Sequence, residues 1–150
     1  MKKCILVADD DEMCREILAQ ALTKYDYEVT TAWNGNEALD SFKNKHYDLL
    51  ITDIEMPGIT GIDLLKEVKI IAPEVGVIIV TGRGTMESYF ESMNNGAFEY
   101  LIKPLKVSEL KKIVTKFFNH SGAVKTKAFH VQTDSKITLM QDNQTGHRGS

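Results

Sequence analysis

The sequence predicts an open α/β domain in which a five-stranded parallel sheet carries helices on both faces. Short apolar runs alternate five times with segments of helical periodicity, which is the pattern of successive βα units. The first run, residues 4–8, is continuously apolar and ends in acids, as is typical of a parallel strand buried on both faces. The chain of 150 residues has 43% hydrophobic and 26% charged residues, the composition of one ordinary globular domain. Right-handed crossovers then leave few ways to wind the sheet.

Each strand and helix is predicted from its own apolar pattern. The strands are predicted at residues 4–8, 27–32, 48–52, 75–80 and 98–102. The intervening helices are predicted from apolar residues at helical spacing: Met13, Ile17, Leu18, Ala21 and Leu22; Ala38, Leu39 and Phe42; Leu64, Leu65, Val68 and Ile71; Met86, Phe90 and Met93; Leu110, Ile113, Val114 and Phe117. In the fourth helix we expect Tyr89 at the surface.

Polar residues mark where several of these helices begin. Asn34, Thr60 and Thr85 each precede a periodic segment and are predicted as N-caps, with Glu37 as the capping-box partner of Asn34. Asp11 is predicted to cap the first helix. Pro73 is predicted to end the third helix, and Gly96 to close the fourth.

Charge and composition exclude several classes of function. The net charge is −3, and the first 118 residues carry −5 because the remainder holds four basic and two acidic side chains. An acidic body argues against direct contact with duplex nucleic acid, which needs clustered Lys and Arg. No apolar stretch approaches the ~20 residues of a membrane span. Two cysteines, Cys4 and Cys14, are too few for a disulfide framework, so we expect reduced thiols and a cytosolic protein.

Acidic residues follow the first and third predicted strands. Asp9, Asp10 and Asp11 end the first strand, and Asp53 ends the third. Ligands of open α/β sheets bind outside the carboxyl ends of the strands. If these two strands are neighbours, the carboxylates meet in one crevice and repel one another. Mg²⁺, which suits one or two carboxylates with waters and phosphate oxygens, resolves that repulsion.

A hydroxyl and an ammonium group are predicted at the same edge. Thr81 ends the fourth strand and Lys103 the fifth. The ammonium suits a phosphoryl oxygen as a point charge, and the hydroxyl can donate to another oxygen. Taken singly, Thr81 would more often be an ordinary turn residue. Together with a carboxylate nucleophile and a metal ion, the set indicates a phosphoryl-transfer site.

These residues resemble the receiver domain of two-component response regulators over roughly residues 3–118. The matching motifs are Asp9-Asp10, Asp53 with Met56-Pro57 and Gly61, Thr81-Gly82, Gly96-Ala97, Tyr100 and Lys103-Pro104. The spacings match as well: 43 residues from Asp10 to Asp53, 28 on to Thr81 and 22 on to Lys103. Five elements in order are far more specific than one acidic pair. Residues 84–87 also resemble receivers of the nitrogen-regulatory activator class.

The resemblance implies a flavodoxin-like strand order 2-1-3-4-5 and a role for each motif residue. It implies that Asp53 is the phosphoacceptor, that Asp10, Asp53 and the backbone carbonyl of Glu55 coordinate Mg²⁺, and that Asp9 acts through water. Thr81 and Lys103 would contact the phosphoryl oxygens, with a cis bond at Lys103-Pro104.

The resemblance also concerns the switch and the partners. Tyr100 would be the aromatic that reports activation, although by itself it reads as core packing. The donor would be a phosphohistidine on a sensor histidine kinase or a phosphotransfer protein, and activation would form a homodimer. The domain would signal rather than turn over an external substrate.

Glu55 and Arg83 are predicted to tune the lifetime of the phosphoryl group. They lie two residues after Asp53 and Thr81, at places that vary in the receiver family and flank the path of hydrolytic water. Their opposite charges allow a bridge across the crevice mouth that obstructs in-line water. The alternatives are that Arg83 turns towards the phosphoryl oxygens instead, or that both side chains point into solvent.

Residues 119–150 are predicted to be a polar tail or linker. Residues 128–141 alternate apolar and polar on either side of a turn, which predicts a weak β-hairpin that is either disordered or docked on another surface. Residues 146–150 could be vector-derived. The chain is then either a stand-alone receiver or a piece of a longer regulator.

Two other functions stay open. A hydrolase of the aspartyl-phosphate kind needs an acid two residues after its nucleophile, where Glu55 lies, but the Met56-Pro57 context and the lack of a substrate-cap region count against it. A receiver that signals without phosphate is the other alternative, against which the complete set of acceptor residues argues.

Overall fold

The protein, described here from a computed structural model over residues 2–120, is a three-layer α/β domain. Its five parallel strands are hydrogen-bonded in the order β2-β1-β3-β4-β5. The strands are β1 (Cys4–Ala8), β2 (Glu28–Ala32), β3 (Leu49–Thr52), β4 (Gly76–Thr81) and β5 (Glu99–Ile102). The helices are α1 (Glu12–Lys24), α2 (Gly35–Asn44), α3 (Gly61–Ile71), α4 (Met86–Asn94) and α5 (Val107–His120). Both the fold class and the predicted strand order are confirmed.

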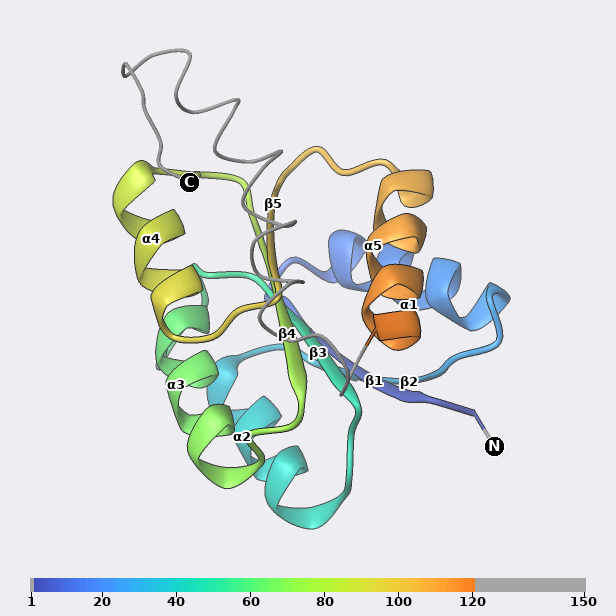
Figure 1. The fold of residues 1–150 in the computed structure, drawn as a ribbon, viewed down its shortest axis with the longest axis horizontal. Coiled ribbons are helices and arrows are strands. Elements are labelled where there is room, and N and C mark those ends of the chain that lie inside the picture. Colours follow the sequence, from blue (N-terminus) through green and yellow to red (C-terminus); the bar gives the residue numbers. More distant parts are fainter. Residues whose placement is uncertain (1, 121–150) are drawn as a thin grey trace.

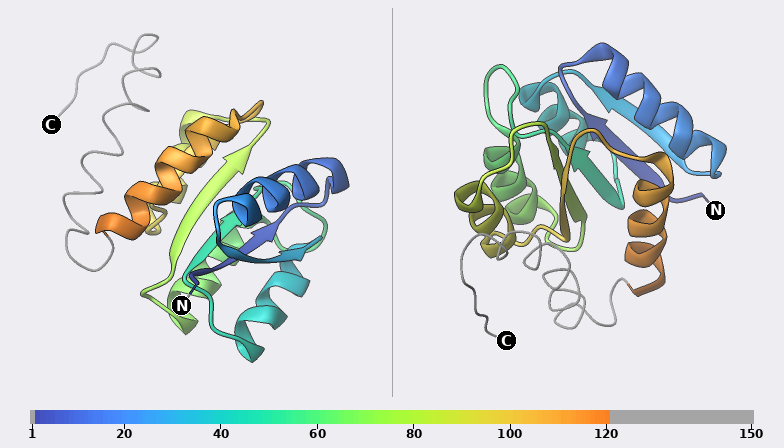
Figure 2. Two further views of the ribbon diagram at one scale, coloured as in Figure 1. Left: turned by 90° about the vertical axis from the view of Figure 1, so that its right-hand side faces the viewer. Right: turned by 90° about the horizontal axis from the view of Figure 1, so that it is seen from above.

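The helices divide between the two faces of the sheet. Figures 1 and 2 show α1 and α5 on one face and α2, α3 and α4 on the other. Each face has its own apolar core, one around Leu22, Ile51 and Val114 and the other around Leu50 and Leu65. All strand residues of β3 and β4 are buried, as their unbroken apolar runs predict.

The predicted helix caps are present. Asp11, Asn34, Thr60 and Thr85 each accept hydrogen bonds from backbone N–H groups of the first turn that would otherwise lack partners. Glu37 differs from its predicted role, because its carboxylate accepts from the Trp33 backbone N–H (2.7 Å) one residue earlier. The α4 helix ends before Gly96, whose φ of +97° suits glycine.

The expected inner face of one helix is wrong, and two other helices expose part of their predicted apolar stripe. Tyr89, expected at the surface, is fully buried, and it shares the inner face of α4 with Ser92 and Met93, while Phe90 is exposed. In α1, Met13 is 72% exposed, and Ile17 is half exposed. Ile71 of α3 is also partly exposed. Helical spacing identifies a stripe of residues but leaves the angle at which the helix docks undetermined; in α4 the buried position is Tyr89 rather than its neighbour Phe90.

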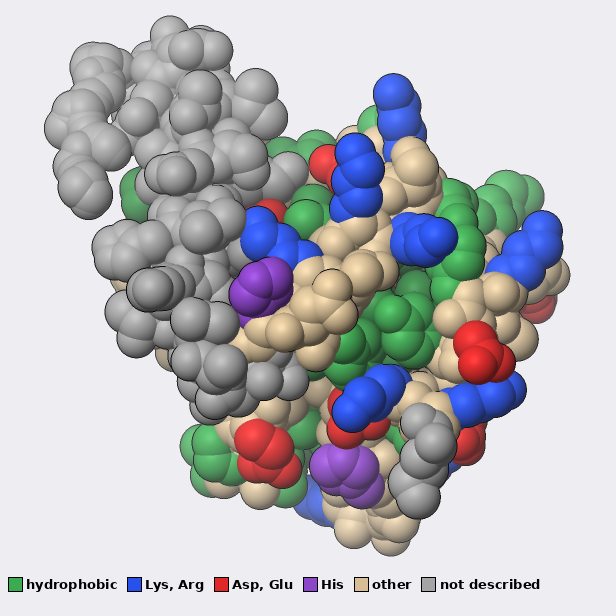
Figure 3. Space-filling view, turned by 45° about the vertical axis from the view of Figure 1, so that its right-hand side comes forward, with side chains coloured by type: hydrophobic (Ala, Val, Ile, Leu, Met, Phe, Trp, Pro, Cys, Tyr) green, Lys and Arg blue, Asp and Glu red, His purple; other side chains and the backbone are tan. Residues whose placement is uncertain are grey.

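Hydrophobic side chains therefore reach the surface on the side of the molecule that α1 and α5 form, with Lys and Arg side chains around them (Figure 3). Throughout the described region, each helix is too short or too polar to cross a membrane. The predicted hairpin at 128–141 and the predicted vector residues lie outside the described residues.

Candidate phosphoryl-acceptor site

The register of the sheet brings the predicted site residues to one edge. Ala8 of β1 pairs with Thr52 of β3, so the residues that follow, Asp9 and Asp53, emerge side by side. The Asp53 backbone N–H extends this ladder by donating to the Ala8 carbonyl at 3.0 Å. On the other side, the Lys103 N–H donates to the carbonyl of Thr81 at 2.8 Å. The predicted site residues thus meet at the carboxyl ends of the strands.

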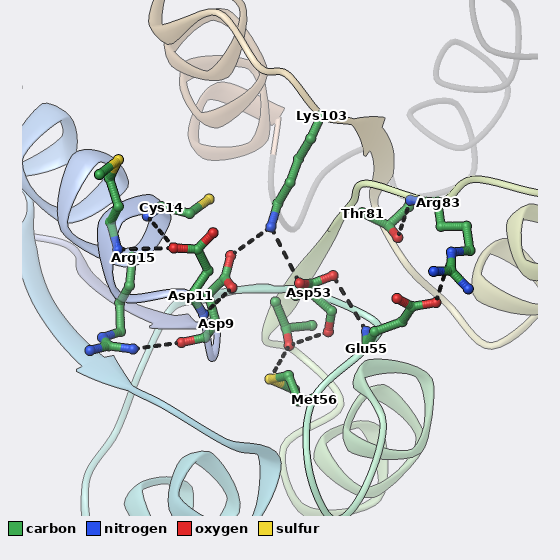
Figure 4. Close-up of polar contacts among 12 residues, drawn as sticks. Asp9, Asp11, Cys14, Arg15, Asp53, Glu55, Met56, Thr81, Arg83 and Lys103 are labelled. Atoms are coloured by element: carbon green, nitrogen blue, oxygen red, sulfur yellow. Dashed lines mark hydrogen bonds and ion pairs between the residues drawn. The ribbon is translucent and has the colours of Figure 1, made fainter.

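Lys103 joins the two buried carboxylates. Its Nζ donates to Asp9 Oδ2 at 2.9 Å and to Asp53 Oδ2 at 3.3 Å (Figure 4). The Lys103 side chain is 21% exposed and that of Asp9 only 2%. The bond between Lys103 and Pro104 is cis, as the resemblance implied. Although burial alone lowers it, the hydrogen bond to Asp9 and the charges of both acids raise the pKa of Lys103 above its ordinary value. Lys103 therefore stays cationic at neutral pH.

The environment of Asp53 penalises its negative charge. The residue is buried, and its Oδ1 accepts the Glu55 backbone N–H at 3.4 Å. Burial raises the pKa of Asp53, the ammonium of Lys103 lowers it, and the neighbouring carboxylate of Asp9 raises it again; the net direction is upward. A cation or an electrophilic phosphoryl group at this carboxylate would relieve that penalty.

Three carboxylates form a set that fits a hard divalent cation. Asp9, Asp10 and Asp53 each offer an oxygen, and these oxygens lie within 4.8 Å of one another. Asp9 and Asp53 are buried, whereas Asp10 is exposed at the mouth of the crevice. Carboxylate oxygens with an open, solvent-facing side match the preference of Mg²⁺, which retains several of its waters.

A close backbone approach holds the acceptor loop in place. The Gly61 N–H donates to the Ile54 carbonyl at 2.8 Å, which brings the start of α3 against the loop that follows Asp53. A Cβ atom on Gly61 would lie 1.9 Å from the Asp53 carbonyl oxygen, so any other residue there would displace the acceptor backbone. The motif glycine is thus explained by space rather than by a turn.

Thr81 and the pair of Glu55 and Arg83 line the other side of the crevice. Thr81 is buried, and its Oγ1 accepts the Arg83 backbone N–H at 3.2 Å. The Arg83 Nε lies 3.7 Å from Glu55 Oε2, and both side chains are largely in solvent, at 79% and 57% exposure. The predicted bridge between Glu55 and Arg83 is therefore formed, although nothing in its geometry tests the predicted effect on phosphoryl lifetime.

Tyr100 connects the site region to α4. Its ring is fully buried and packs edge-on against Tyr89, with ring centroids 5.4 Å apart. Its hydroxyl hydrogen-bonds Ser88 Oγ and accepts the Thr85 backbone N–H at 3.3 Å. Ser88 also completes the capping box of α4 with Thr85. The sequence analysis did not identify Ser88, although its place three residues after the predicted N-cap Thr85 is that of a capping-box partner.

Together the fold and site define a receiver domain. The response regulator receiver family model matches residues 5–115, and the chain belongs to that family. The chain is 38% identical over 114 residues to the DNA-binding transcriptional regulator NtrC of Klebsiella pneumoniae, covering 76% of this chain and 24% of that protein. It is 35% identical over 120 residues to the transcriptional regulatory protein ZraR of Escherichia coli strain K12, covering 80% of this chain and 27% of that protein. The chain thus spans about a quarter of the length of these curated relatives, and the resemblance to the nitrogen-regulatory class is confirmed.

Solved structures agree with this assignment. A CheY-like receiver domain from Methanospirillum hungatei JF-1 superposes with a TM-score of 0.79 at 30% identity, covering 81% of this chain and 97% of that one. The response regulator TrrA of Thermotoga maritima, solved in complex with Mg²⁺ and BeF, superposes with a TM-score of 0.70 at 40% identity, covering 76% and 97%. The chain is therefore a receiver domain of two-component signalling.

Proposed function

We propose that Asp53 accepts a phosphoryl group from a phosphohistidine and that the resulting acyl phosphate switches the domain. The observation that carries this is the Lys103 ammonium, held within hydrogen-bonding distance of both Asp9 and Asp53. An Asp53 carboxylate oxygen attacks phosphorus while the bond from phosphorus to the histidine nitrogen breaks, and the imidazole leaves with the electron pair. Catalysis here is positioning and charge neutralisation.

The remaining residues receive roles from their positions. Asp10 and Asp53, with the Glu55 backbone carbonyl, would hold Mg²⁺ directly and Asp9 would hold it through water. When bound, the ion neutralises charge on the transferring phosphoryl oxygens. Lys103 and Thr81 would contact the phosphoryl oxygens of the product; Thr81 Oγ1 accepts the Arg83 N–H, and its own O–H remains available as a donor. The relative TrrA was solved in complex with Mg²⁺ and BeF, which supports a role for Mg²⁺ in this proposal.

The signal would leave the site through Tyr100 and α4. A shift of Thr81 towards the phosphoryl group would change the space beside the start of α4, where the Thr85 N–H at the cap and the Ser88 hydroxyl in the first turn hold the Tyr100 hydroxyl. We propose Tyr100 as the switch residue on that ground. The partners would be a sensor histidine kinase or phosphotransfer protein and, on activation, a second copy of the chain.

Several predictions about the wider protein stay proposals. The domain would act as a signalling module whose only chemistry is its own phosphorylation and dephosphorylation, in the cytosol. The receiver would occupy residues 1–118, with a tail from 119 onwards. NtrC and ZraR are regulators of transcription, so a longer form of this protein could carry an output of that kind; direct nucleic-acid contact is not proposed for residues 1–118, given their net charge of −5.

Asp53→Asn tests the acceptor assignment. With Mg²⁺ and acetyl phosphate as the donor, the wild-type protein should gain one phosphoryl group, and the variant should gain none because an amide cannot form the acyl phosphate. Intact-protein mass spectrometry measures both. Asp63→Asn, an acid exposed in the first turn of α3, is the matched control and should be labelled like the wild type. Equal labelling of Asp53→Asn would refute the proposal.

A further inference from the structure

Arg15 makes two separate contacts with the acidic loop between β1 and α1. Its backbone N–H donates to the carbonyl of Asp11 at 2.9 Å, as expected in the first turn of a helix. Its side chain folds back, and Nη1 donates to the carbonyl of Asp9 at 2.8 Å (Figure 4). The two carbonyls flank Asp10, so one residue holds the backbone on both sides of it.

Asp10 depends on this support more than its neighbours do. The Asp9 side chain is buried, with Oδ1 accepting the Asp11 N–H at 2.9 Å and Oδ2 accepting from Lys103. The Asp53 side chain is likewise paired with Lys103. Asp10 is the exposed member of the three-carboxylate set. The position of its carboxylate is therefore set by the backbone that carries it, and that backbone is held by Arg15.

We propose that Arg15 is a positioning residue that presets Asp10 for divalent-cation binding by clamping the carbonyl of Asp9. This inference rests on the proposed function, since it assumes Mg²⁺ at the carboxylate set. Groups that orient metal ligands from outside the coordination sphere typically change metal affinity 10- to 100-fold when removed. A guanidinium is suited to the task because its donors form a rigid fork that stays charged.

Electrostatics and positioning predict opposite effects, which makes the proposal testable. The positive charge of Arg15 repels a cation at the neighbouring carboxylates, so losing the charge alone would tighten Mg²⁺ binding. Losing the hydrogen bond to the Asp9 carbonyl would instead weaken Mg²⁺ binding. Arg15→Met removes both charge and donors while keeping an unbranched apolar side chain at the position. Arg15→Lys keeps the charge, but its ammonium is one bond shorter and lacks the planar fork, so it weakens the clamp without changing the charge.

The experiment is a Mg²⁺ titration followed by the backbone amide signals of the site in two-dimensional NMR, which also reports whether each variant is folded. We expect the Kd for Mg²⁺ to rise about tenfold in Arg15→Met and to rise also in Arg15→Lys. Without Mg²⁺, amide exchange at Asp10 should be faster in both variants. Lys24→Met, which removes a positive charge from the last turn of the same helix, should not raise the Kd.

The outcomes separate the two proposals. If the wild-type protein shows no saturable Mg²⁺ binding, the proposed function fails. If the wild type binds but Arg15→Met and Arg15→Lys bind equally well or more tightly, the clamp is wrong and the proposed function stands. A rise in Lys24→Met as large as in Arg15→Met would likewise refute the clamp. Should Arg15→Met not fold, Arg15→Lys decides alone, because its charge is unchanged.

Discussion

Two ion pairs lie on opposite sides of the crevice, and they differ in almost every physical respect. Lys103 and Asp9 are 2.9 Å apart, with side chains 21% and 2% exposed. Arg83 and Glu55 are 3.7 Å apart and mostly in solvent. In the buried pair, removing one partner leaves a charge without compensation. In the exposed pair, water replaces the missing partner. The buried pair therefore determines the structure of the unphosphorylated site. The exposed pair can affect only the access of small molecules to that site.

The largest expected effect comes from breaking the buried pair. Lys103→Met leaves Asp9 and Asp53 buried side by side without their shared cation, and we expect the free energy of unfolding to fall by about 3 kcal/mol at pH 7. Denaturant unfolding in Mg²⁺-free buffer measures it. Adding Asp9→Asn should restore part of the loss, because it removes the uncompensated charge.

Lys66→Met is the matched control for that comparison. Lys66 pairs with Glu91 at 3.2 Å, but both side chains are more than 40% exposed. Its removal should change the unfolding free energy by less than about 1 kcal/mol. Equal losses in Lys66→Met and Lys103→Met would show that burial does not separate the two kinds of pair.

An intermediate effect is expected at Asp53, where burial and Asp9 raise the carboxyl pKa. Because the pKa is raised in the folded state, protonation of Asp53 stabilises the fold, and its ionised carboxylate lowers the free energy of unfolding at neutral pH. Asp53→Asn should raise the unfolding free energy by about 1 kcal/mol at pH 7–8 in Mg²⁺-free buffer. The advantage should shrink as the pH falls through the raised pKa and vanish below the ordinary carboxyl value. Thermal unfolding between pH 8 and 4 would detect it; an advantage that grows towards low pH contradicts the assignment.

The smallest effect on stability is expected at the exposed pair. Glu55→Ala and Arg83→Ala should each change the unfolding free energy by less than about 1 kcal/mol. If the bridge covers the acyl phosphate, each substitution changes the dephosphorylation rate, and the double variant shows less than the product of the two changes. Single-turnover decay of the phosphoprotein measures this. Decay like the wild type in both single variants, or independent effects in the double, would exclude a functional bridge.

Much of the fold was predictable because local patterns and global topology agree. Short strand-like runs predicted all five strands to within one residue at each end, and Asn34, Thr60 and Thr85 cap helices where expected. The edge location of Asp9, Asp53 and Lys103 followed from strand ends alone. The sequence pattern could not predict which of these side chains hydrogen-bond to one another. Those contacts depend on the register between strands whose residues lie 44 or more positions apart in sequence.

The sequence alone determined the strand and helix order, the acidic crevice and the residue types for phosphoryl transfer. Only the tertiary structure decided the burial of Tyr89, the exposure of Met13 and the contact between Tyr100 and Ser88, because the docking angle of a helix is set by all the side chains beneath it. The same holds for Arg15. Its spacing to Asp11 is an ordinary helical one, but the reach of its guanidinium to the Asp9 carbonyl depends on how the loop turns out of the sheet.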